Sequence, residues 1–269
     1  MLINTIILFF RDALPIFVIT TILISLLHQQ GIKQRWYVIA AFASVLLSLL
    51  LLTTIDDISR TLDDTGREWL YAFCYIVCYF LSLILLGQLV VVNTQTRRQR
   101  CFRNRAVAMA LMAILMTLNG ANFLIYLTGF WYQNNASNVL TTGVVLGVGI
   151  CASIAVLLYF FMAFFQRYCR IVREILLIFF SAGLLMKASN LLIQIDVLPS
   201  DNFLWDSNHV IAENAEVGQL LTAFFGYDAT PTMLQLWLYL SAIMLAFFVL
   251  FRANPTKLNQ RKTVSKEAV

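Results

Sequence analysis

Two short polar segments interrupt the apolar stretches of this 269-residue chain. The first, FFRDALPIFV, places Arg11 and Asp12 side by side within an apolar run. The second, MTLNGANFLI at residues 116–125, places Asn119 and Asn122 one helical turn apart. Carboxylate and amide oxygens are ligands for hard metal cations. Both segments are therefore candidate cation sites.

The charges of the first segment have two interpretations. Buried charges within a bilayer either pair with one another or line a functional cavity. Arg11 and Asp12 are thus a structural ion pair, completed by Lys187 from a later apolar run, or the remainder of an ion site. When all three residues are ionised they sum to +1, and a positive membrane interior repels multivalent cations.

A second group of metal-ligand side chains lies near the C-terminal end of the chain. Asp206, His209, Glu213 and Glu216 recur at helical spacing, and they would form one stripe if the segment is helical. Such a stripe is either a site that captures a metal ion outside the membrane or a solvated polar face. The apolar residues that follow, from Val217 to Phe224, predict a helix lying on the bilayer surface.

The composition indicates which elements must position these side chains. The chain is 60% hydrophobic and 12% charged, with a mean hydropathy of +0.79, so we expect an all-α integral membrane protein. The apolar runs are too long and too uniform for a membrane β-barrel. Seven of them predict membrane helices, at 3–27, 37–54, 69–92, 106–130, 138–165, 175–198 and 233–251.

The basic residues predict the orientation of these helices. Of the 19 Lys and Arg residues, 15 fall after the first, third and fifth predicted helices or in the tail. By the positive-inside rule, the N-terminus is outside and the tail is cytoplasmic. We therefore expect a single membrane domain, 1–251, followed by a basic cytoplasmic tail, 252–269. No aromatic platform accompanies the basic loops, so lipid is the expected partner and nucleic acid is not.

The two polar segments also align with each other. The alignment sets Asp12 on Asn119 and Pro15 on Asn122, and the two helices enter the membrane from opposite sides. This arrangement predicts two inverted three-helix repeats plus a seventh helix. Transporters built in this way place their site near the midplane, where the repeats meet.

Motifs throughout the chain resemble the oxidase-dependent high-affinity iron permease family. The resemblance rests on the two polar segments, the seven-helix layout and four further motifs. Those motifs are FFSAGLLMKASN (179–190), LWDSN (204–208), FFGYDATP (224–231) and LWLYLSAIM (236–244). The resemblance implies a multi-pass protein of the bacterial inner membrane that transports iron. It also implies a periplasmic oxidase or iron-binding protein as a partner.

The chain departs from the family's Arg-Glu-x-x-Glu signature, whose carboxylates would ligate iron in transit. The first segment has Asp12 and Pro15 at the acidic positions, and the second has Asn119 and Asn122 with Leu118 in place of the arginine. One carboxylate of four remains. No motif of an enzyme or of a built-in cofactor occurs. Two hypotheses stay open: an iron transporter with an altered site between the first and fourth helices, or a transport-defective scaffold or accessory subunit of a membrane complex.

Overall fold

The computed structural model describes residues 7, 9–28, 35–60, 64–90, 97–131, 137–165, 171–199, 203–213 and 215–252. In these ranges the chain is helical apart from turns and one isolated bridge between Phe203 and Thr232. The helices are η1 (Phe9–Ala13, a π-helix), α2 (Leu14–His28), α3 (Arg35–Ser59), α4 (Gly66–Val90), α5 (Arg97–Trp131), α6 (Ser137–Phe165), α7 (Val172–Gln194), α8 (Glu216–Phe225) and α9 (Met233–Arg252).

The seven predicted membrane helices are confirmed: the described residues include seven helices that are long and apolar enough to cross a bilayer. Their limits differ from the prediction mainly at α3, α5 and α7. α3 continues to Ser59 rather than ending at 54. α5 begins at Arg97 rather than at 106, because the basic residues before the apolar run continue the same helix. α7 ends at Gln194 rather than at 198, and turns follow it.

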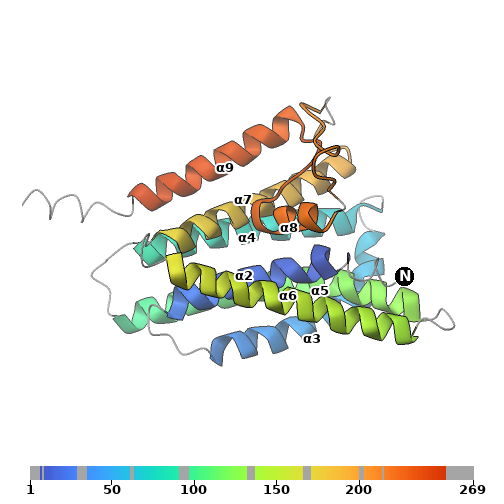
Figure 1. Ribbon diagram of the computed structural model, residues 1–269, viewed down its shortest axis with the longest axis horizontal. Coiled ribbons are helices and arrows are strands. Elements are labelled where there is room, and N and C mark those ends of the chain that lie inside the picture. The colour runs from blue at the N-terminus through green and yellow to red at the C-terminus, as the bar shows by residue number, and fades with distance from the viewer. Residues whose placement is uncertain are drawn as a thin grey trace, which may run out of the picture.

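The helices form a bundle around α2, which packs against α5, α6, α7 and α8. Leu14, Val18 and Leu23 of α2 have no exposed surface. α3 and α9 lie at opposite edges of the bundle (Figure 1). Large apolar side chains such as Phe42 on α3 and Met244 on α9 are exposed there, as expected for helix faces in contact with lipid.

Residues 203–213 and 215–232, which we call the re-entrant segment, connect α7 to α9 and bring α8 against the bundle. The bridge between Phe203 and Thr232 closes the segment at its base. At its far end, Gly226 takes a left-handed conformation (φ 69°) and caps α8. A Cβ built on Gly183, midway along α7, would lie 2.9 Å from the backbone nitrogen of Gly226. The absence of side chains at both positions therefore allows α8 to dock halfway along α7.

This docking corrects two expectations. α8 is not a helix on the bilayer surface, because its C-terminal end packs against the middle of α7 and its sides contact α2 and η1. In Figure 1 it lies within the bundle, between α2 and α7. The stretch from Asp206 to Glu213 consists of turns and bends rather than helix. Helical spacing thus does not gather the predicted stripe of metal ligands.

Candidate functional site

All five predicted transport residues line one cavity. The cavity has a volume of about 580 Å³ and lies among η1, α4, α5, α7 and the re-entrant segment. Its lining includes Arg11, Asp12, Asn119, Asn122 and Lys187. Residues from two segments that are far apart in the sequence thus meet at a single polar site within an otherwise apolar bundle.

The π-helix η1 sets the position of Arg11 and Asp12. Pro15 has no backbone N–H, so the carbonyl of Arg11 cannot receive the usual α-helical hydrogen bond from residue 15. The helical turn therefore holds one extra residue at this point, and the chain continues as α2 after Ala13. Single π-turns of this kind are frequent at functional sites.

Arg11 and Asp12 form an ion pair with two hydrogen bonds. Nε of Arg11 donates to Oδ1 of Asp12, and Nη2 donates to Oδ2, both across 3.3 Å. The Asp12 side chain is 5% exposed, whereas the Arg11 side chain is 65% exposed and borders the cavity. The carboxylate is therefore enclosed by protein, and the guanidinium is the more accessible group of the pair.

The amides of α5 are held by neighbouring groups. Nδ2 of Asn119 donates to the carbonyl of Leu115 across 2.7 Å, within the same helix. Oδ1 of Asn122 accepts a hydrogen bond of 2.9 Å from Nη2 of Arg67, in the first turn of α4. The same guanidinium lies 5.4 Å from the ring centre of Tyr71, within the range of a cation–π contact.

Sequence reasoning missed Arg67, Glu68 and Tyr71 as lining residues. The predicted third helix begins at 69, so Arg67 and Glu68 fall outside it. A signal was present: Arg67, Tyr71 and Tyr75 are spaced four residues apart and share one face of α4. The hydroxyl of Tyr71 and Oε2 of Glu68 are buried and have no hydrogen-bond partner among the described residues.

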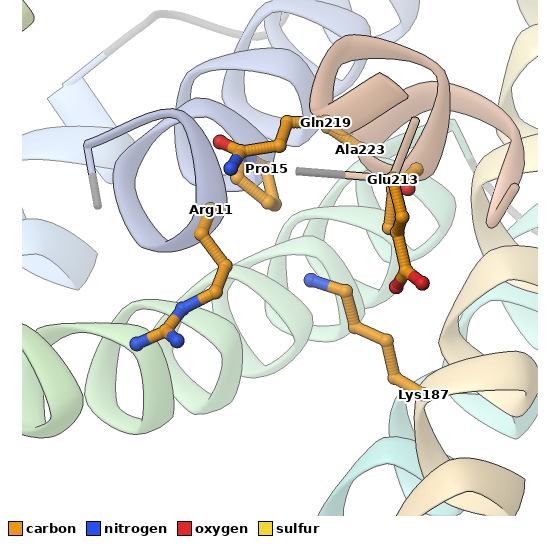
Figure 2. A pocket seen from close by; sticks show the side chains of 7 residues that line it. Arg11, Pro15, Lys187, Glu213, Gln219 and Ala223 are labelled. Atoms are coloured by element: carbon orange, nitrogen blue, oxygen red, sulfur yellow. The ribbon is translucent and has the colours of Figure 1, made fainter. Parts of the chain in front are cut away.

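A smaller pocket of about 80 Å³ adjoins this region and is lined by Arg11, Pro15, Lys187, Glu213 and residues of α8. Figure 2 shows the Lys187 ammonium extending towards η1 and the Glu213 carboxylate descending beside Lys187. Among the described residues, Lys187 makes no ion pair within 4 Å. The predicted completion of the Arg11–Asp12 pair by Lys187 is therefore not a direct contact.

Glu213 lines both this pocket and the larger cavity. Burial, and next the charge of Asp228, raise the pKa of Glu213 above its ordinary value. His209 is exposed, and Oδ1 of Asp206 accepts a backbone hydrogen bond from Asn208 within its own turn. The side chain of Glu216 lies outside the described part of the structure. Within that part, no three His, Cys, Asp or Glu side chains are close enough to hold a metal ion.

Comparison with known protein families identifies the family of the chain. The sequence profile of the iron permease FTR1 family matches residues 2–255. Searches of curated proteins and of solved structures found no match. Members of the family are permeases rather than enzymes, and the match extends over all seven candidate membrane helices. The chain is a multi-pass membrane protein that belongs to the iron permease FTR1 family.

Proposed function

We propose that this protein transports iron across the membrane through the cavity among η1, α4, α5 and α7. One observation carries the proposal: Asp12, Asn119 and Asn122, which occupy acidic positions of the family signature, line a single cavity. Family membership supports iron as the transported ion. Amide oxygens bind hard cations more weakly than carboxylates do, so we expect a lower affinity for bare iron than the full signature would give.

The proposed path begins on the outer side. With the N-terminus outside, the first turn of α4 and the last turns of α7 face outward. These turns contribute Arg67, Asn190 and Gln194 to the cavity lining. Towards the opposite side, α2 is closely packed through Val18 and Ile22. Iron would enter the cavity from outside, and its release inward requires a second conformation.

Helix packing supports the inverted-repeat proposal. α3 packs against α5 and α6 packs against α2, while α4 and α7 pack against each other. These pairs are related if a pseudo-twofold axis exchanges α2 with α5, α3 with α6, and α4 with α7. A site at the meeting point of η1 and α5 then lies where transporters with inverted repeats bind their substrates.

The cell setting and partners are part of the same proposal. We place the protein in a bacterial inner membrane, with a periplasmic oxidase or iron-binding protein delivering iron to the cavity. The alternative is a transport-defective member that serves as a scaffold or accessory subunit of a membrane complex. It is favoured by the engagement of Asp12 and Asn122, whose side-chain oxygens bind guanidinium groups.

Uptake of radioactive iron by a bacterial host that lacks its own iron permeases tests the proposal. The chain should raise uptake above that of the empty vector, and Asp12→Asn should lower it at equal protein level in the membrane. Asp57→Asn is the matched control, because Asp57 is exposed near the end of α3. If uptake with the chain equals that of the empty vector, while gene deletion disrupts a membrane complex, the scaffold alternative holds.

A further inference from the structure

The acidic and basic side chains that line the large cavity balance one another. They are Arg11, Asp12, Arg67, Glu68, Lys187 and Glu213. Their formal charges sum to zero when all are ionised. A bare ferric ion would add three uncompensated positive charges to a site among apolar helices, which is unfavourable. Iron that is already bound by carboxylates brings little or no net charge.

The cavity oxygens of Asp12 and Asn122 are already engaged, whereas Oε2 of Glu68 has no hydrogen-bond partner among the described residues. Both carboxylate oxygens of Asp12 accept hydrogen bonds from Arg11, and Oδ1 of Asn122 accepts one from Arg67. A metal ion would have to displace a guanidinium at either position. A ligand with carboxylates of its own would instead bind these guanidinium groups, for which bidentate carboxylates are well matched.

Two donor side chains at the cavity are unpaired in the described part of the structure. The ammonium of Lys187 borders both pockets and has no ion pair among the described residues. Tyr71 is 3% exposed, and its hydroxyl has no hydrogen-bond partner in the described structure. An enclosed donor without an acceptor is destabilising, and carboxylate oxygens would satisfy both groups.

The size of the cavity fits an organic complex. Pockets for small molecules usually measure about 300–1,000 Å³, and this cavity measures about 580 Å³. The charge balance of the lining, the engaged oxygens of Asp12 and Asn122, the unpaired donors Lys187 and Tyr71 and the cavity volume all favour one ligand. We infer that the cavity binds iron as its complex with a small polycarboxylate. Arg67, Lys187 and Tyr71 contact the carboxylate oxygens, and the metal keeps its carboxylate ligands. The inference rests on the proposed function and specifies its substrate.

The test uses full-length purified protein and two labels. Binding of ¹⁴C-citrate is measured with and without Fe(III), and ⁵⁵Fe uptake into proteoliposomes is measured from ferric citrate and from Fe(II) kept reduced by ascorbate. We expect saturable binding of ferric citrate, at least tenfold tighter than that of citrate alone. Arg67→Gln and Lys187→Gln should each weaken it tenfold or more, and Arg60→Gln, at an exposed position, should leave it unchanged.

Tyr71→Phe removes one hydroxyl and keeps the ring, so it tests the donor without a large change in packing. It should weaken ferric citrate binding severalfold while the protein elutes as the parent does in gel filtration. Uptake of ⁵⁵Fe from Fe(II) without any ¹⁴C-citrate binding would overturn the inference and leave the proposed function standing. If proteoliposomes take up no ⁵⁵Fe from either source although ferric citrate binds, the inference stands and the transport proposal fails.

Discussion

Nη2 of Arg67 on α4 donates a 2.9 Å hydrogen bond to Oδ1 of Asn122 on α5. Arg11 makes the corresponding contact with Asp12 in η1. The signature of the family supplies an arginine from within each motif helix, and α5 has Leu118 at that position. A guanidinium from a neighbouring helix therefore lies beside the second motif, where the chain itself has no arginine.

Arg67→Gln should lower iron uptake severalfold, because Asn122 loses the group that orients its amide. A hydrogen bond from a charged donor contributes about 1.5–3 kcal/mol, so we also expect a lower melting temperature. Arg67→Lys, which keeps the charge but not the planar fork, should restore uptake only in part. Uptake by Arg67→Gln equal to that of Arg60→Gln would show that the contact has no role in transport.

The Arg11–Asp12 pair predicts a non-additive stability effect. Asp12→Asn leaves the Arg11 charge without its carboxylate, and because Arg11 borders the cavity we expect a cost of about 1–2 kcal/mol, below the value for a charge facing lipid. Replacing both residues, Arg11→Met with Asp12→Leu, should cost less stability than the sum of the costs of the single changes. Thermal unfolding in detergent measures all three variants. Additive losses would indicate that the two side chains act independently.

The docking of the re-entrant segment predicts a strong effect at one glycine. A Cβ on Gly226 would overlap Cα of Gly183, and the positive φ of Gly226 disfavours any other residue. Gly226→Ala should destabilise the protein by roughly 2–4 kcal/mol. Gly149→Ala is the control, because a Cβ there meets nothing within 4 Å. Equal melting temperatures for the two variants would contradict the close approach of α8 to α7.

Glu213 predicts a pH-dependent difference in stability. Its folded pKa is raised above the ordinary value of 4.5 by burial and by Asp228, so the folded state holds the proton more tightly than the unfolded state. The stabilisation that Glu213 contributes is fully present below pH 4.5 and is lost as the pH rises through the raised pKa. Glu213→Gln should therefore gain stability relative to the parent as pH rises through this window. A constant difference across the window would exclude the shift, and Asp57→Asn serves as the control.

The charge asymmetry predicts the orientation in the membrane. A reporter fused after Arg105 should be cytoplasmic, and one placed between residues 203 and 213 should be external, because 15 of 19 basic residues belong to the side assigned as cytoplasmic. Alkaline phosphatase and fluorescent-protein fusions report the two locations. The reverse labelling would invert the proposed direction of entry.

The membrane helices were predictable because each needs only a long apolar run, and Leu, Ile, Val and Phe supply seven. The convergence of Asp12 with Asn119 and Asn122 also followed from the sequence, through the alignment of two motifs. The contribution of Arg67 to the cavity could not be predicted in this way. A charged residue beside an apolar run is typical of a loop, and it is the packing of α4 beside α5 that brings Arg67 to Asn122. Likewise, the spacing from Asp206 to Glu216 fits a helix, yet turns occupy most of it.

The position of α8 within the bundle also could not be predicted from the sequence alone. Its apolar face fits a bilayer surface as well as a protein groove, since both bury the same side chains. What decides between them is the pairing of Gly183 with Gly226, two residues in different elements that the sequence alone does not connect. The docking of α8 brings Glu213 and Thr222 to the cavity.

The central claim is that iron crosses the membrane through the cavity lined by Asp12, Asn119 and Asn122. Its most direct test is the initial rate of ⁵⁵Fe accumulation, supplied as ferric citrate and separately as Fe(II), in proteoliposomes containing only the purified protein. We expect accumulation above that of empty liposomes from at least one source, and its loss in the variant Asn119→Leu with Asn122→Leu, which replaces the cavity amides with apolar groups. Unchanged accumulation in that folded variant, or none with the parent protein, would contradict it.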